Sequence, residues 1–134
     1  MIVVDASVVV EFLLNASSKH DIAELIAAQE SLAAPELIEY EVGSVLRRLN
    51  LAGKLSDDRG AQALQAFGAL RVELYPVRSL SARVWELRHN VTYYDGSYLA
   101  LAEALDLTLY TSDRRLASVR GHSAKLVCFD QAIF

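Results

Sequence analysis

The chain has 134 residues, 53% of them hydrophobic, and its formal net charge at pH 7 is −4. This length suits one domain with a buried core, so we expect a single domain over residues 1–134. Its one cysteine, Cys128, excludes an intramolecular disulfide and, without CxxC or HExxH spacings, the common zinc sites. A single cysteine favours a reducing compartment such as the cytoplasm.

The opening residues 1–14 are apolar enough to suggest a signal peptide. They lack a basic leader, however, and they carry Asp5 and Glu11 within the apolar run. These two acids argue against secretion and against membrane insertion. No other segment approaches the roughly 20 apolar residues of a membrane-spanning helix, so we expect no membrane attachment.

Charge is distributed unevenly along the chain. Eight acids and one base precede Arg47, and nine acids and twelve bases follow from there on. The acidic part is suited to cations and the basic part to phosphates, although solvated helix faces explain such an imbalance equally well.

Short apolar runs alternate with longer segments of helical periodicity. The β-branched Ile2–Val4 predicts a strand, and Ser7 is suited to cap a short helix over 8–14. Pro35 suits the first turn of a long helix, and Gly53 suits its end. Further strands are predicted at 32–34, 72–77, 107–110 and 126–129, and further helices at 21–30, 36–52, 56–70, 80–89, 95–105 and 114–119.

This alternation predicts an α/β fold with a central, mostly parallel sheet flanked by helices on both faces. In such sheets, ligands bind outside the carboxyl ends of the strands. Asp5 follows the first strand directly, and Asp113 lies just past the strand at 107–110. Each acid is also placed to cap the helix after it. Thr111 adds a hydroxyl in the same turn as Asp113, suited to orient a carboxylate or a metal-bound water.

Asp95 opens a strongly helical run. At helical spacing it shares a face with Tyr98, Leu99 and Ala102, which we expect to be buried against the sheet. An acid in the first turn is also favoured by the helix dipole, so a simple cap is the alternative.

The helix over 36–52 carries two acids at the edges of its apolar stripe. Glu41 lies at one edge and Glu39 at the other, and periodicity does not choose between them. The stripe consists of Ile38, Val42, Val45, Leu46 and Leu49.

Other polar residues are weaker candidates. Glu11 is expected to reach solvent at the edge of its helix, and Asp106 to serve a turn between a helix and a strand. Packing is favoured over base stacking for three tyrosines, and no ligand spacing links the three histidines. These residues are Tyr93, Tyr94, Tyr98, His20, His89 and His122.

Four stretches together resemble the PIN-domain ribonucleases, specifically the VapC toxins of bacterial type II toxin–antitoxin pairs. They are IVVDASVVVEFLL, APELIEYEVGSVLRRL, YYDGSYLALAEAL and LYTSDRRLA, in the family's order and spacing over nearly the whole chain. The resemblance implies that the family's four acids are Asp5, Glu41 (in preference to Glu39), Asp95 and Asp113.

The sequence departs from the family pattern at two positions. Ser44 stands where relatives often have Asn, which shortens or removes any polar contact there. Gly96 stands where Ala is usual, which is expected to loosen the helix start that holds Asp95.

The resemblance implies an endoribonuclease that depends on Mg²⁺ or Mn²⁺. Asp5 and Asp113 are expected to hold the principal metal, with Asp95 as a direct or water-mediated ligand. Glu41 is expected to complete the site or to orient the attacking water. The hydroxyls of Thr111 and Ser7 are expected to support the site. Arg114 and Arg115, directly after Asp113, are the candidates to meet the RNA, although a role as solvated surface charges explains them equally well. The implied partners are RNA, a VapB-type antitoxin and a second copy of the chain.

The chemistry explains why four acids are needed. Hydrolysis of a phosphodiester builds negative charge that a divalent cation stabilises, and Mg²⁺ and Mn²⁺ prefer carboxylate oxygens. Two carboxylates about 4 Å apart repel by roughly 4 kcal/mol at an effective dielectric near 20, so the cluster is costly without a cation.

Two other interpretations are open. A phosphoaspartyl protein also places acids at strand ends, but the phosphatase type needs a second Asp two residues after the first, where this chain has Ser7. A receiver domain needs paired acids and a late lysine, and neither is evident. A non-catalytic module with the PIN fold is the second alternative, which the departure at Ser44 keeps open.

Overall fold

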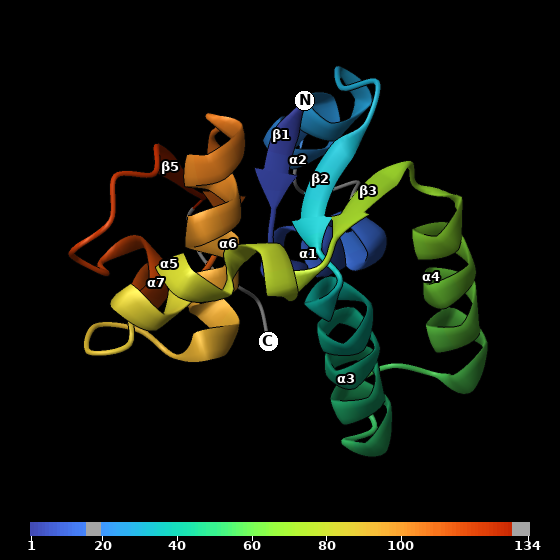
Figure 1. Cartoon of the computed structure of the whole chain (residues 1–134). Helices are drawn as coiled ribbons and strands as arrows, with labels where there is room; N and C mark the ends of the chain where they lie inside the picture. Colours follow the sequence, from blue (N-terminus) through green and yellow to red (C-terminus); the bar gives the residue numbers. More distant parts are fainter. Residues whose placement is uncertain (16–19, 130–134) are drawn as a thin grey trace.

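The computed structural model describes residues 1–15 and 20–129, in which five parallel strands lie between layers of helices (Figure 1). The sheet has the order β3-β2-β1-β4-β5, and all four neighbouring pairs are parallel. The α/β prediction is therefore confirmed. The strands are β1 (Ile2–Val4), β2 (Leu32–Pro35), β3 (Val72–Tyr75), β4 (Leu109–Thr111) and β5 (Leu126–Cys128).

Helices cover both faces of the sheet. One face carries α6, which packs against β1, β2 and β4 with α5 outside it; on the other face α1 packs against β4, with α2, α3 and α4 around it (Figure 1). The helices are α1 (Ala6–Asn15), α2 (His20–Ala27), α3 (Leu37–Leu51), α4 (Asp57–Ala69), the 3-10 helix η1 (Val77–Leu80), α5 (Ser81–Glu86), α6 (Tyr93–Leu105) and α7 (Arg114–Ala117).

Two expected helix starts are wrong in detail. α1 begins at Ala6, and the carboxylate of Asp5, rather than Ser7, accepts a hydrogen bond from the backbone N–H of Val8 at 3.2 Å. Pro35 is the last residue of β2, paired in register with Tyr75 of β3, instead of the first turn of α3. The start of α1 is thus set by a local contact with Asp5, whereas pairing with β3 extends β2 past its local signal.

The order of the elements brings the carboxyl ends of β1 and β4 side by side in the middle of the sheet. Val3 of β1 pairs with Leu109 of β4, and the backbone N–H of Asp5 donates to the carbonyl of Tyr110 at 3.3 Å. Residues that follow these two strands therefore meet at one edge, close to the amino end of α3, where the predicted ligand site lies.

Two smaller expectations have clear outcomes. Glu11 is completely buried, so its predicted exposure is wrong; α1 packs against α2, α3 and α4 as well as against β4. Asp106 lies at the end of α6 in the left-handed conformation (φ 52°), as its predicted turn role requires. In the described ranges, no helix combines the length and apolar character needed to cross a membrane.

A half-buried ion pair fastens α5 and α6 to the loop that follows α7. Arg83 Nε donates to Glu103 Oε1 at 2.7 Å, and Glu103 Oε2 also accepts from the backbone N–H of Ser123 at 2.7 Å. The guanidinium and these hydrogen bonds lower the pKa of Glu103 to about 2. The ion pair should therefore stabilise the fold at every pH at which the Glu103 carboxylate is charged.

We expect Glu103→Gln to lower the free energy of unfolding by about 2 kcal/mol at pH 7, since it removes a charged acceptor from a half-buried network. Because the pKa of Glu103 is lowered by folding, this contribution is present above about pH 4.5 and declines as the pH falls toward 2. Urea unfolding at pH 7 and at about pH 3 measures both effects. Glu86→Gln is the control, because Glu86 is exposed and its contact with Arg83, at 3.4 Å, is longer than that of Glu103. Equal losses of stability in the two variants would contradict the prediction.

Candidate active site

The carboxylate of Asp5 is buried at the end of β1, where two hydroxyl groups donate hydrogen bonds to it. Its Oδ1 accepts from the Oγ of Ser7 at 2.6 Å, and its Oδ2 accepts from the Oγ1 of Thr111. Only 5% of Asp5 is exposed. Burial raises its pKa to about 6, the three hydrogen bonds from Ser7, Thr111 and Val8 oppose this rise, and the charge of Asp113 adds to it.

The same two hydroxyls connect the ends of β1 and β4. Thr111 Oγ1 accepts from the backbone N–H of Asp113 at 2.9 Å, and Ser7 Oγ accepts from the backbone N–H of Ser112 at 2.9 Å. Thr111 is fully buried as the last residue of β4. The structure thus brings both predicted supporting residues to Asp5, where they fix the direction of its carboxylate.

Glu41 faces α6 from the first half of α3. The hydroxyl of Tyr98 donates to Glu41 Oε1 at 2.6 Å, across 57 positions of sequence. Burial raises the pKa of Glu41, the bond from Tyr98 lowers it, and the charge of Asp95 raises it further. Glu39 is exposed, whereas Glu41 is half-buried and its carboxylate is influenced by the charge of Asp95. The sequence predicted a packing role for Tyr98 and missed this contact, although its place on the face of Asp95 was visible.

Asp95 is a half-buried residue in the first turn of α6. The cap of this helix is Thr92, whose Oγ1 accepts from the backbone N–H of Asp95 at 3.1 Å, so the Asp95 carboxylate is not the cap. Burial raises the pKa of Asp95, the charge of Asp113 raises it further, and that of Arg115 lowers it. Asp95 is therefore electrostatically coupled to the acid that follows β4.

Asp113 caps the short helix α7. Its Oδ1 accepts from the backbone N–H of Arg115 at 2.9 Å, and the Nε of Arg115 lies 3.6 Å from the same oxygen. The charge of Asp113 raises the pKa of both Asp5 and Asp95, and the charge of Asp95 raises that of Glu41. Four carboxylates from separate parts of the chain thus influence one another in series, and we refer to them as the four acids.

The four acids offer hard oxygen donors of the kind that Mg²⁺ and Mn²⁺ prefer. Within the described residues, no three His, Cys, Asp or Glu side chains are close enough to form a ready-made metal cage. Raised pKa values and mutual repulsion nevertheless mean that positive charge between these acids would stabilise their ionised forms. The donor set therefore fits a divalent cation that completes the site on binding.

The helix start that carries Asp95 is closely packed. A methyl group added at Gly96 would lie 3.1 Å from a methyl carbon of Val84 and 3.4 Å from one of Val91. These valines lie in α5 and in the loop before α6, so their side chains occupy the space that an alanine at position 96 would need. Ser44, the other departure from the family pattern, is exposed in a hollow beside Glu41.

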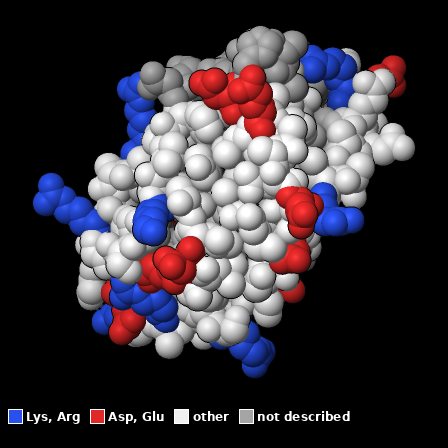
Figure 2. Space-filling view, turned by 90° about the horizontal axis from the view of Figure 1, so that it is seen from above, with Lys and Arg blue, Asp and Glu red and all other residues white. Residues whose placement is uncertain are grey.

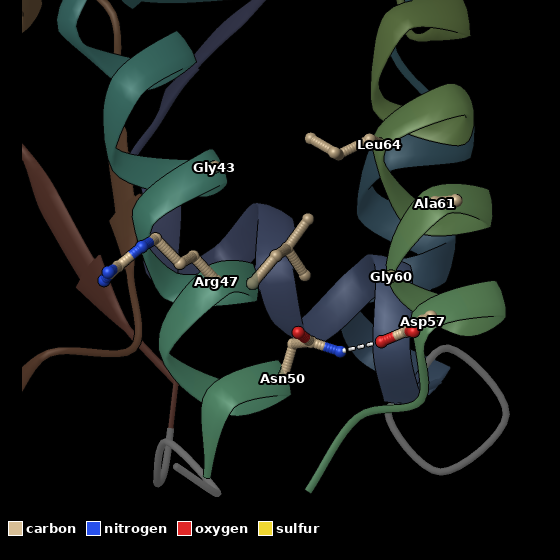
Figure 3. Close-up of a pocket in the computed structure, with 8 residues that line it drawn as sticks. Gly43, Arg47, Asn50, Asp57, Gly60, Ala61 and Leu64 are labelled. Atoms are coloured by element: carbon tan, nitrogen blue, oxygen red, sulfur yellow. Dashed lines mark hydrogen bonds between the residues drawn. The ribbon is translucent and has the colours of Figure 1, made fainter. Parts of the chain in front are cut away.

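Other surfaces do not coincide with the four acids. The groove between α3 and α4, about 350 Å³, is lined by Gly43, Leu46, Arg47 and Leu64 among others, and Asn50 donates to Asp57 at 2.8 Å across its lower end (Figure 3). None of the four acids lines it. On the face seen from above, acidic and basic side chains are interspersed around a large uncharged area (Figure 2).

Comparison with known proteins assigns the class to which this fold and site belong. The family model for the PIN domain matches residues 2–122, which include all four acids. Among solved structures, PAE2754 from Pyrobaculum aerophilum superposes with a TM-score of 0.67 at 26% identity, covering 93% of this chain and 81% of that one. The chain therefore belongs to the PIN-domain family.

Curated relatives narrow this assignment. The VapC ribonuclease Mb0985 of Mycobacterium bovis is 47% identical over 117 residues, which are 87% of this chain and 89% of that protein. Ribonuclease VapC1 of Mycobacterium tuberculosis is 40% identical over 120 residues, 89% of this chain and 90% of the relative. Within the PIN-domain family, the chain is thus a member of the VapC ribonucleases.

Proposed function

We propose that the four acids are the catalytic centre of a metal-dependent endoribonuclease. As a VapC family member, the chain is a ribonuclease and the toxin of a toxin–antitoxin pair. One observation carries the assignment of the centre: burial and mutual repulsion raise the pKa of Asp5, Glu41 and Asp95 at the edge where parallel sheets bind ligands. Carboxylates that are buried and repel one another in this way are costly to keep ionised unless a cation binds between them.

PIN-domain ribonucleases depend on metal ions in general, and we propose Mg²⁺ or Mn²⁺ for this chain. Asp5 and Asp113 would hold the principal ion, and Asp95 would be a direct or water-mediated ligand. When bound, the ion supplies positive charge against the anionic transition state of phosphodiester hydrolysis. The hydroxyls of Ser7 and Thr111 keep the Asp5 carboxylate directed by donating to its two oxygens.

Glu41 is suited to orient the attacking water. Its Oε1 accepts from Tyr98, which leaves Oε2 to accept a proton or a hydrogen bond from water. The raised pKa makes its carboxylate a better proton acceptor than an ordinary glutamate. Two arginines, Arg114 and Arg115, line a hollow with Asp113 and would bring positive charge to the RNA.

Because the chain belongs to a family of toxin–antitoxin toxins, its partner is an antitoxin protein. We propose that this antitoxin is of the VapB type. VapBC2 from Rickettsia felis, solved bound to a DNA fragment from their promoter, has the same fold, with a TM-score of 0.70 at 17% identity over 97% of this chain and all of that one. We further propose RNA as the substrate, a homodimer as the assembled toxin, and the cytoplasm as its compartment, which the single cysteine supports.

The pair Glu41 and Glu39 offers a matched test within one helix. We expect Glu41→Gln to slow RNA cleavage in Mg²⁺ by about a hundredfold or more, since general-base contributions are typically 10²–10⁴-fold. Glu39→Gln should cleave like the unchanged protein, because Glu39 faces solvent. Initial rates on total RNA, with and without EDTA, measure this. Equal cleavage rates for the two variants would exclude Glu41 from the catalytic centre. If the unchanged protein shows no Mg²⁺-dependent cleavage, a non-catalytic module is favoured instead.

A further inference from the structure

Tyr98 lies among three of the four acids. It belongs to α6, one turn after Asp95, and only 1% of it is exposed. Burial raises the pKa of its hydroxyl well above the usual range, and the charges of Glu41, Asp5 and Asp95 raise it further. Tyr98 is therefore a neutral phenol throughout the neutral pH range, and its O–H is a hydrogen-bond donor beside the acids.

The hydroxyl of Tyr98 holds the carboxylate of Glu41. It donates to Glu41 Oε1 at 2.6 Å, a length typical of a hydrogen bond to a charged acceptor. Across residues 1–15 and 20–129, Glu41 makes no other side-chain hydrogen bond and no ion pair. A glutamate side chain has three torsions to fix, whereas the ring of Tyr98 is held by the core around it. The rigid donor thus sets the direction of the flexible acceptor.

This hydrogen bond joins the two helical layers of the fold. Glu41 belongs to α3, which packs against α1, α4 and β2, whereas Tyr98 belongs to α6, which packs against α5 and the central strands (Figure 1). Between α3 and α6 themselves, contact is slight in the part of the chain that the structure describes. The position of the Glu41 carboxylate relative to Asp95 of α6 therefore depends on this bond more than on packing between the two helices.

The contact engages one oxygen of Glu41 and leaves the other available. Because Oε1 accepts from Tyr98, Oε2 is the oxygen that remains for water. Glu41 borders a hollow of about 430 Å³, so water can reach its side chain. Proton transfer to a carboxylate is fastest when the acceptor is held in one productive geometry. A carboxylate free to rotate would spend only part of its time in that geometry.

We propose that Tyr98 is a positioning residue of the catalytic centre, whose hydroxyl fixes the Glu41 carboxylate so that its second oxygen meets the attacking water. This inference rests on the proposed function and adds a fifth residue to the four acids. Tyr98 itself touches neither the RNA nor the metal and acts only through Glu41. Loss of its hydroxyl should therefore slow the chemical step and leave the affinity for RNA and for the metal nearly unchanged.

Tyr98→Phe removes the hydroxyl and keeps the buried ring. In Mg²⁺ we expect kcat for RNA cleavage to fall about twentyfold, less than in Glu41→Gln because the carboxylate is still present, while KM changes by less than about twofold. Tyr75→Phe is the matched control, since the Tyr75 hydroxyl donates at 3.4 Å to the exposed Glu73 on the edge strand β3. The control should cleave as the unchanged protein does. Thermal unfolding shows whether each variant keeps its fold.

A double-mutant cycle separates positioning from a purely structural role. In the Glu41→Gln background, Tyr98→Phe should change the single-turnover cleavage rate by less than about twofold, since the group through which Tyr98 acts is already altered. If the two losses multiply instead, Tyr98 acts through other parts of the fold and the proposal is overturned. A folded Tyr98→Phe variant that cleaves as fast as the unchanged protein would overturn it as well.

A measurement without metal or RNA tests the hydrogen bond itself. In EDTA, proton NMR of the unchanged protein should show a slowly exchanging tyrosine hydroxyl proton that is lost in Tyr98→Phe and kept in Tyr75→Phe. Its resonance should move upfield in Glu41→Gln, because a neutral acceptor makes a weaker bond. Absence of this proton from the unchanged protein would overturn the inference alone, whereas absence of Mg²⁺-dependent cleavage with the proton present would remove the proposed function.

Discussion

Asp5→Asn is expected to slow RNA cleavage by at least about a thousandfold, equivalent to about 4 kcal/mol of transition-state stabilisation. Asn keeps the shape of the side chain, and its Oδ1 can still accept from Ser7 and from the backbone N–H of Val8. The variant loses the negative charge that would hold a cation at the end of β1. Its fold should therefore survive while its chemistry fails.

Initial rates in Mg²⁺, beside circular dichroism and thermal unfolding of the same samples, measure this effect. Asp58→Asn is the control, because it removes a carboxylate of the same kind from the exposed first turn of α4. That control should cleave at the rate of the unchanged protein. A folded Asp5→Asn variant that retains a tenth of the activity or more would exclude Asp5 from the centre.

The second large effect is a pH-dependent response to metal. Folding raises the pKa of Asp5 from 3.8 to about 6, so the folded chain holds this proton more tightly than the unfolded chain. Without metal, stability should therefore fall as the pH rises from about 4 to 6, by about 3 kcal/mol for this group alone. Raised pKa values of Glu41 and Asp95 act in the same direction.

A divalent cation should reverse this loss, since it binds the ionised acids. We expect Mn²⁺ to raise the melting temperature clearly at about pH 7.5 and little at about pH 5, because protons compete for the ligands. Scanning fluorimetry with and without Mn²⁺ at the two pH values measures this. The pH dependence should vanish in Asp5→Asn/Asp113→Asn; equal stabilisation by Mn²⁺ at both pH values would contradict the role assigned to the buried carboxylate.

Much of the fold follows from local sequence signals. β-branched runs such as Ile2–Val4 and the stop at Gly53, which has a φ of 75°, specify elements that the structure places within a few residues. The differences arise from long-range pairing. Thr111 belongs to β4 because it pairs in register with Cys128 and its carbonyl accepts from Phe129 at 2.8 Å. No local pattern encodes a partner strand fifteen residues away.

The residues of the candidate site were also only partly predictable from the sequence. Asp5 and Asp113 followed from topology, and Asp95 from the buried face of its helix. Glu41 was separable from Glu39 only by resemblance to a family, since the contact that distinguishes it is made by Tyr98 of another helix. Such contacts between helices decide which side chains are buried, and the periodicity of a single helix does not predict them.

The most direct test of the four-carboxylate centre is a calorimetric titration of the purified chain with Mn²⁺ at about pH 7.5. We predict at least one bound ion per chain, with an affinity that falls by about a hundredfold or more in Asp5→Asn/Asp113→Asn and is unchanged in Asp58→Asn. Equal Mn²⁺ affinity in the double variant and the unchanged protein would contradict a metal centre built on these acids.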